Sequence, residues 1–205
     1  MVVSRKASPG EEVAVDGRPV EFARGGSPRV IVYHKPVGEL VTHRDPQGRP
    51  TVYSRLPRGR WVPVGRLDIN SSGLLLLTDS GELANRLMHP RHGVEREYAV
   101  RVFGDIGPQQ LRRLREGVTL EDGRAAFERI EPAGSRGGVP GANRWYRVLL
   151  REGRKREVRR LFEAVGAKVS RLIRVRYGPI DLPRDLRPGS WRELVPTAAA
   201  RLFSD

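Results

Sequence analysis

Apolar residues recur along this chain with two periods, and the shorter of them predicts strands. Val30–Tyr33 is a dense run of β-branched and aromatic residues, and Leu74–Leu77 is a wholly apolar run with the length of a buried strand. In residues 96–103 and 169–177, apolar and polar side chains alternate as in a half-buried strand. Residues 145–150 form another predicted strand. Several alternating strands are typical of a largely antiparallel sheet.

Three segments have helical spacing instead. The first helix follows the leucine run, with Asp79 as its N-cap, and ends before Pro90. The second begins near Pro108 and is capped by Gly117. The third and clearest covers residues 154–165. Mixed in this order, the strands and helices predict an α+β fold with a mixed, mostly antiparallel sheet.

A length of 205 residues fits one catalytic-sized unit with a small appendage. We predict an N-terminal tail over residues 1–26 and a catalytic domain over residues 27–205. The tail contains a short strand followed by a hairpin turn at Asp16-Gly17. The glycine-rich stretch 134–141 is predicted to be a loop.

Charge and composition narrow the function classes. Basic residues outnumber acidic ones by 38 to 24, the net charge is +14, and nearly all the cations are arginines, which favours a polyanionic partner. The absence of cysteine excludes disulfides, a thiol nucleophile and a cysteine-ligated metal, and four scattered histidines predict no metal site. No apolar run has the length of a membrane span or a signal peptide. We expect a cytoplasmic protein without a membrane partner.

The most informative stretch surrounds Asp68. This aspartate lies in a turn rich in glycine, asparagine and serine, directly before the apolar run Leu74–Leu77. Two interpretations are open from the residues alone. The carboxylate can simply close a turn of the Asx type, or it can be held at the mouth of the core, where its surroundings tune its ionisation.

This stretch also carries a family resemblance. Residues 65–90, GRLDINSSGLLLLTDSGELANRLMHP, resemble the catalytic motif of the pseudouridine synthases of the RsuA/RluB branch, which modify ribosomal RNA. Three further matches follow the family order, at residues 34–42, at 95–100, and at 143–160 with its continuation to 175. The resemblance covers roughly residues 29–195. Residues 161–183 are more similar to the RluB group, whose members modify large-subunit RNA.

The resemblance implies a fold of two subdomains flanking a basic cleft, with Asp68 at its floor as the essential catalytic residue. It implies that Tyr98 stacks on the target base and that Arg154 supplies the cation that keeps Asp68 ionised. Helical spacing agrees with the last role, because it places Arg154 four residues before Val158 on the apolar stripe, where a cation needs a partner. The alternative is that Arg154 lies in a frayed first turn and reaches solvent.

Further basic residues are candidates for RNA contact. By resemblance, Arg66 helps to hold open the space left by an extruded base, which must leave the stack before its glycosidic bond can be reached. Lys35-Pro36 and His89-Pro90 are expected to shape the backbone rather than to do chemistry. The predicted RNA-contacting residues are Arg66, Lys155, Arg156, Arg159, Arg171 and Arg174.

The resemblance thus predicts a monomeric enzyme, free of cofactor and metal, that isomerises a uridine of ribosomal RNA to pseudouridine, with large-subunit RNA favoured. A catalytically silent RNA-binding or ribosome-assembly factor on the same scaffold is the alternative. An acid/base hydrolase would want a second positioned carboxylate beside Asp68. Members of this branch usually begin with a small RNA-binding domain, of which residues 1–26 look like a remnant. Either that domain has been lost or the chain starts late.

Overall fold

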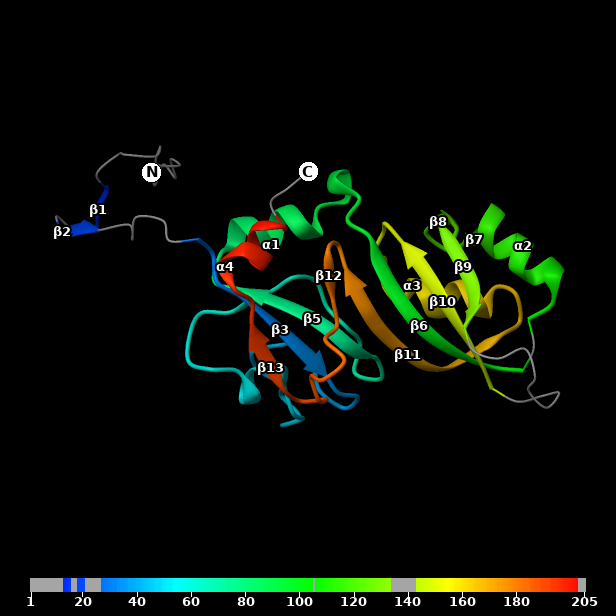
Figure 1. Cartoon of the computed structure of the whole chain (residues 1–205), viewed down its shortest axis with the longest axis horizontal. Helices are drawn as coiled ribbons and strands as arrows, with labels where there is room; N and C mark the ends of the chain where they lie inside the picture. The colour runs from blue at the N-terminus through cyan, green and yellow to red at the C-terminus, as the bar shows by residue number, and fades with distance from the viewer. Residues whose placement is uncertain (1–12, 16–17, 21–26, 105, 134–142, 203–205) are drawn as a thin grey trace.

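The computed structural model describes residues 13–15, 18–20, 27–104, 106–133 and 143–202 (Figure 1). Strands β1 (Val13–Val15) and β2 (Arg18–Val20) pair antiparallel, which confirms the hairpin expected in the tail. The turn at residues 16–17 and the predicted loop at 134–141 lie outside the described residues. The origin of the tail as a domain remnant stays a prediction.

One sheet of nine strands runs through the described part of the domain, in the order β13-β3-β5-β11-β6-β10-β9, with β4 beside β5 and β12 beside β11 (Figure 1). In chain order the strands are β3 (Val30–Lys35), β4 (Val62–Pro63), β5 (Ser72–Thr78), β6 (Arg96–Phe103), β9 (Arg129–Ala133), β10 (Arg144–Leu150), β11 (Lys168–Tyr177), β12 (Ile180–Asp181) and β13 (Trp191–Glu193). Strands β7 (Val118–Leu120) and β8 (Gly123–Ala125) form a separate hairpin. Within the large sheet only β5 and β11 pair in parallel, so the predicted mixed, mostly antiparallel sheet is confirmed.

Two of the predicted helices occur with small changes at their ends. Helix α1 (Gly81–Met88) begins later than expected, because the Ser80 side chain accepts the Leu83 N–H and acts as the N-cap. Asp79 instead accepts a hydrogen bond from the backbone N–H of Arg29. Helix α2 (Pro108–Glu116) begins and is capped where predicted. The remaining short elements are η1 (Val52–Arg55), η2 (Pro90–His92) and α4 (Pro196–Ala200).

The third helix is shorter than its sequence pattern indicates. Helix α3 (Glu157–Glu163) begins three residues after Arg154, since Arg156 adopts a left-handed backbone conformation with φ 53°. That conformation does not continue into a right-handed helix. Arg154 therefore lies in the turn before the helix, and the helical spacing used to orient its side chain does not apply to it.

The leucine run of β5 is buried because both faces of the sheet are covered at this point. Leu74 and Leu76 pack into a core with α1 and α4, whereas Leu75 and Leu77 join a second core on the opposite face. A strand covered on both sides has no need of alternating polar residues. The half of the sheet formed by β6, β10 and β9 has only one apolar face, which contacts α3. The alternating pattern of β6 follows from this arrangement.

The two halves of the sheet meet where β5 begins. Strands β5 and β11 share only two registered pairs, Ser72 with Ile173 and Gly73 with Arg174. Gly73 has φ 106°, and a Cβ atom at this position would lie 2.2 Å from the Arg174 carbonyl oxygen and 2.6 Å from its nitrogen. Only glycine permits an approach this close. The junction therefore requires a glycine at position 73.

Replacing Gly73 with alanine should destabilise the protein by roughly 3 kcal/mol or more, because positive φ and backbone overlap act together. Gly166→Ala is the matched control, since Gly166 has φ 79° but a Cβ atom there would meet nothing within 4 Å. It should lose only about 1–2 kcal/mol. Denaturant unfolding of both variants measures the difference, and equal losses would contradict the close-approach explanation.

Candidate active site

Asp68 lies in the turn that leads into β5, at the junction of the two halves of the sheet. The backbone N–H of Ser71 donates to the Asp68 carbonyl oxygen at 3.0 Å, which closes the turn. Asp68 is half-buried, and its neighbours Ile69 and Asn70 are exposed. The carboxylate thus lies on a structured turn with access to solvent.

The buried side chain of Lys35 holds this turn in place through hydrogen bonds. It is the last residue of β3 and is fully buried. Its Nζ donates to the carbonyl oxygens of Asp68 at 3.1 Å, Ser71 at 2.8 Å and Pro36 at 2.9 Å. One ammonium group therefore ties the Asp68 turn to the turn that follows β3. This confirms the expectation that Lys35 shapes the backbone.

Two buried arginines hold the same segment from the other side. Arg159 of α3 donates from Nη2 to the carbonyl oxygen of Asn70 at 3.0 Å and from Nη1 to that of Val169 at 3.1 Å. Arg174 of β11 donates from Nε to the Leu74 carbonyl oxygen at 2.7 Å, and its guanidinium lies over the ring of Tyr177. Three buried cations thus bind backbone carbonyls between residues 68 and 74, and two of them, Lys35 and Arg159, also interact electrostatically with Asp68.

Burial and neighbouring charges have opposing effects on the pKa values of Lys35 and Arg159. Burial lowers the pKa of Lys35 to about 8, and the negative charges of Glu39 and Asp68 counteract this effect. Burial likewise lowers the pKa of the Arg159 guanidinium, with the nearby Arg156 adding to the effect and Asp68 opposing it. Asp68 therefore interacts with Lys35 and Arg159, which lie on different elements of the fold.

Arg154 does not fill the position predicted for it. Its Nε donates to Glu152 at 2.6 Å, and its remaining guanidinium nitrogens bind the carbonyl oxygens of Asp122, Gly123 and Arg124 in the β7–β8 hairpin. The predicted ion pair between Arg154 and Asp68 is wrong, because α3 starts later and the preceding turn directs Arg154 to this hairpin. The cation next to Asp68 from this motif is Arg159.

Tyr98 lies on β6, the strand next to β11 and two strands away from β5. The register places Tyr98 opposite Arg174, which in turn pairs with Gly73. Its side chain is buried in the core on the α3 face, and its hydroxyl makes no hydrogen bond with any residue that the structure describes. The sheet register therefore brings Tyr98 to the same junction as the Asp68 turn.

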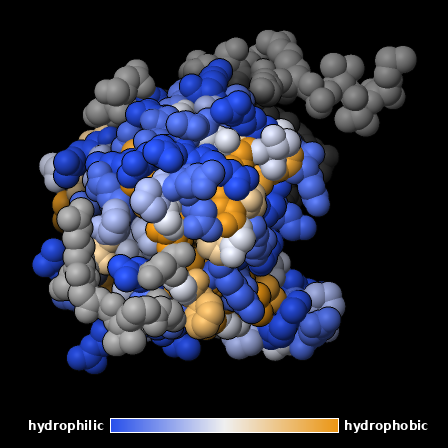
Figure 2. Space-filling model, turned by 90° about the vertical axis from the view of Figure 1, so that its right-hand side faces the viewer, coloured by the Kyte–Doolittle hydropathy of each residue, from blue (hydrophilic) through white to orange (hydrophobic). Residues whose placement is uncertain are grey.

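The predicted RNA-contacting residues separate into two groups. Arg66, Lys155, Arg156 and Arg171 are exposed and can reach a phosphate. Arg159 and Arg174 are buried and donate to backbone carbonyls, so they are less accessible to a phosphate, and their contact with RNA stays a prediction. The end of the molecule that contains α2 is also largely hydrophilic (Figure 2), and its arginines 112, 113 and 115 are exposed.

Sequence reasoning missed a second buried polar group beside Lys35. The Tyr33 hydroxyl donates to Glu39, and Arg55 Nε donates to the other oxygen of the same carboxylate at 2.7 Å. Burial and this hydrogen bond raise the pKa of Tyr33. A signal was present, because Tyr33 and Lys35 follow Ile31 at a spacing of two residues and so share its buried face.

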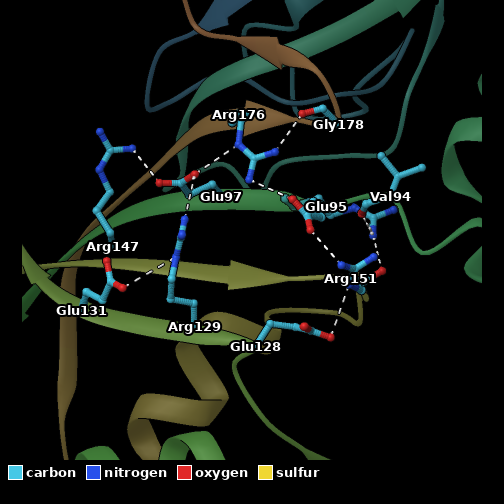
Figure 3. Close-up of polar contacts among 11 residues, drawn as sticks. Val94, Glu95, Glu97, Glu128, Arg129, Glu131, Arg147, Arg151, Arg176 and Gly178 are labelled. Carbon is cyan, nitrogen blue, oxygen red and sulfur yellow. Dashed lines mark hydrogen bonds and ion pairs between the residues drawn. The ribbon is translucent and has the colours of Figure 1, made fainter. Parts of the chain in front are cut away.

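The face of the sheet opposite α3 carries a charge-balanced lattice (Figure 3). Glu97 binds Arg147 at 3.1 Å and Arg176 at 3.1 Å, and Arg176 continues to Glu95 at 3.0 Å. Arg151 extends the chain of contacts from Glu95. The lattice consists of Glu95, Glu97, Glu128, Glu131, Arg129, Arg147, Arg151 and Arg176. Equal numbers of carboxylates and guanidinium groups leave this lattice without net charge, so the lattice itself attracts a polyanion poorly.

A cavity of about 500 Å³ lies elsewhere, against α1. It is lined by Pro28, Ser80, Glu82, Leu83, Asn85, Arg86, His89, Arg91 and His92. None of these belongs to the group around Asp68, so the predicted basic cleft at Asp68 stays a prediction. Across the described ranges, no cluster of three or more metal-ligating side chains occurs and no helix has the length and apolarity to cross a membrane.

Comparison with known proteins decides the family. Residues 29–164 match the family model described as RNA pseudouridylate synthase. The chain belongs to this family. The matched region contains the Asp68 turn, Tyr98 and Arg159, so the carbonyl-binding cations described above lie within or next to the family domain.

Curated relatives extend the similarity beyond this region. The chain is 56% identical over 194 residues to "Ribosomal large subunit pseudouridine synthase B" of Escherichia coli (strain K12), which covers 92% of the chain and 65% of that relative. It is 62% identical over 169 residues to the protein of the same name from Yersinia pestis, covering 81% of the chain and 52% of the relative. The chain thus spans less than two thirds of the length of these RNA pseudouridylate synthases. Their names confirm the assignment to the RluB group.

Solved structures support the fold. A structure titled "Crystal structure of pseudouridylate synthase" matches with a TM-score of 0.74 and 25% identity, covering 97% of this chain and 83% of that one. A chain from an H/ACA RNP bound to a substrate RNA matches with a TM-score of 0.54 and 20% identity over 75% of this chain and 48% of that one. At this lower identity the likeness shows the fold alone. The predicted pseudouridine synthase fold is confirmed.

The lowered pKa of Lys35 has a measurable consequence for stability. Between pH of about 8 and 10.5 the unfolded chain keeps this proton while the folded protein releases it, so the contribution of Lys35 to the free energy of unfolding rises with pH in that window. Denaturant unfolding at several pH values should show a more positive slope for the wild type than for Lys35→Met. Identical slopes would mean that Lys35 titrates normally.

Proposed function

We propose that this chain converts a uridine of large-subunit ribosomal RNA to pseudouridine, with Asp68 as the catalytic carboxylate. The observation that carries the proposal is the Asp68 turn, whose carbonyl oxygens bind the buried cations Lys35 and Arg159 while Asp68 itself is only half-buried. A rigid, ionised carboxylate that can reach a ribose is what the reaction requires.

The reaction is an isomerisation, and its atoms balance without a second substrate. The bond between N1 of uracil and C1′ of ribose breaks, the base turns, and C5 bonds to C1′. C5 loses its proton and N1 gains one. Asp68 supports the step either by attacking the sugar or by removing a proton from it, and in both cases the charged form acts.

The other residues have distinct proposed roles. Tyr98, from the junction side of β6, stacks on the extruded base. Arg159 provides the positive charge beside Asp68 that the sequence had assigned to Arg154. Arg66 is exposed two residues before Asp68 and supports the opened RNA. Lys155, Arg156 and Arg171 contribute phosphate contacts from exposed positions.

The choice of ribosomal RNA rests on the relatives, whose printed names specify the large ribosomal subunit. The cation excess, at a net charge of +14, agrees with a polyanionic substrate. A hydrolase with paired carboxylates is disfavoured, because Glu39 is buried and occupied by Tyr33 and Arg55. We further propose that the protein acts as a monomer in the cytoplasm and without a cofactor.

Asp68→Asn should abolish pseudouridine formation while leaving folding and RNA affinity unchanged, since the amide keeps the shape but not the charge. Release of tritium from C5-labelled uridine in transcribed large-subunit RNA measures turnover, and filter binding measures affinity. The control is Asp181→Asn, an exposed aspartate on β12, which should keep full activity. Undiminished turnover in Asp68→Asn would refute the role of Asp68. A wild type that binds the RNA but releases no tritium would identify a silent RNA-binding factor.

Arg159→Lys should lower kcat by about tenfold or more with little change in KM, because lysine keeps the charge but cannot bridge the carbonyls of Asn70 and Val169. Arg154→Lys is the matched control from the same motif and should retain kcat within about threefold. Steady-state kinetics on the same RNA, with thermal unfolding to check the fold, separate the two. A larger loss in Arg154→Lys would return the role of the activating cation to Arg154.

A further inference from the structure

Two turns on either side of Lys35 form a single unit beside the catalytic carboxylate. The turn after β3 contains Val37 and Gly38, and the Gly38 N–H donates to the carbonyl oxygen of Ile69 at 2.7 Å. The Lys35 ammonium binds carbonyl oxygens from both turns. The relative position of these turns is therefore fixed by four hydrogen bonds.

The tips of this unit are apolar and exposed. Val37 is 59% exposed and Ile69 is 37% exposed, although Ile69 is the immediate neighbour of Asp68. Single exposed apolar residues are common on protein surfaces and carry little information by themselves. Here, however, two of them come from hydrogen-bonded turns next to the carboxylate, in a protein whose neighbouring exposed residues include Arg66 and Asn70.

The chemistry of an extruded uridine provides a use for such a pair. When a base leaves its stack, the faces of the flanking bases lose their apolar contacts, and inserted aliphatic side chains can replace these contacts. Valine and isoleucine suit this task because branching at Cβ limits χ1, so little side-chain entropy is lost on contact. A rim on fixed turns also adds no cost of ordering the backbone.

We propose that Val37 and Ile69 form an apolar rim that packs against the face of a nucleobase flanking the extruded uridine. This rests on the proposed function, because it takes the extruded nucleotide to be the one that Asp68 acts on. Exposed cations at Arg66, Lys155 and Arg156 bind phosphates, whereas the rim contacts the base itself. The rim thus adds a contact that salt does not screen.

The test replaces the apolar groups without disturbing the turns. Val37→Ser/Ile69→Ser should lower kcat/KM for tritium release from C5-labelled large-subunit RNA by about tenfold or more, with an unchanged melting temperature. Val37→Ile/Ile69→Leu keeps apolar side chains and should stay within about threefold of the wild type. Val195→Ser is the matched control, since Val195 is 62% exposed and lies at the N-cap of α4; it should leave kcat/KM unchanged.

A second measurement separates the rim from the catalytic proposal. In the Asp68→Asn background, the double serine substitution should weaken binding of the same RNA by about fivefold at about 200 mM salt, where non-specific phosphate binding is suppressed. Weaker binding together with an inactive wild type would refute the catalytic proposal and keep the rim as an RNA contact. Unchanged binding and unchanged kcat/KM in the double serine variant would overturn the rim. An equal loss in the apolar variant would overturn it as well, because the effect would then come from the turns.

Discussion

The close approach of Gly73 to the backbone of Arg174 is the constraint on which the rest of the structure depends. It joins the two halves of the sheet through two registered residue pairs, next to a core on the α3 face that both halves share. The proposed catalytic residue, Asp68, lies in the turn directly before this contact. Because β5 enters the sheet here, the Asp68 turn lies between the two halves. Lys35 of β3 and Arg159 of α3 bind carbonyls of this turn, and Arg174 of β11 binds the Leu74 carbonyl in the strand that follows it.

These cations act in an unusual way, since they bind peptide carbonyls instead of carboxylates. A direct ion pair would neutralise the Asp68 carboxylate and occupy its oxygens. Carbonyl binding takes up the donors of the Lys35 ammonium and part of those of the two guanidinium groups, since Arg159 Nε and Arg174 Nη2 have no hydrogen-bond partner among the described residues, and it does not neutralise the positive charges. The Asp68 carboxylate thus interacts with the charges of Lys35 and Arg159, while its oxygens accept no hydrogen bond from the residues that the structure describes. The same bonds fix the turn, so position and electrostatics have a common origin.

Sequence analysis predicted the five longest strands of the large sheet and the positions of helices α1 and α2, because these follow from local periodicity, whereas the role of Asp68 comes from a long motif and stays a prediction. It failed where one backbone conformation changed the outcome. The left-handed Arg156 shortened α3 and moved Arg154 away from Asp68. No periodicity reveals such a residue, and cations that bind carbonyls cannot be told from surface cations by type alone. The spacing of two residues from Tyr33 indicates that Lys35 is buried, but two of its three carbonyl partners, Asp68 and Ser71, lie in a turn that is distant in the sequence.

The balanced lattice on the outer face of β6, β9, β10 and β11 gives the molecule electrostatic sidedness. A net charge of +14 spread evenly would attract a nucleic acid in any orientation. Because the lattice has no net charge, the excess of cations lies on other parts of the protein. A polyanion that approaches the lattice is therefore attracted less strongly than one that approaches the exposed arginines elsewhere, so the attraction has a direction.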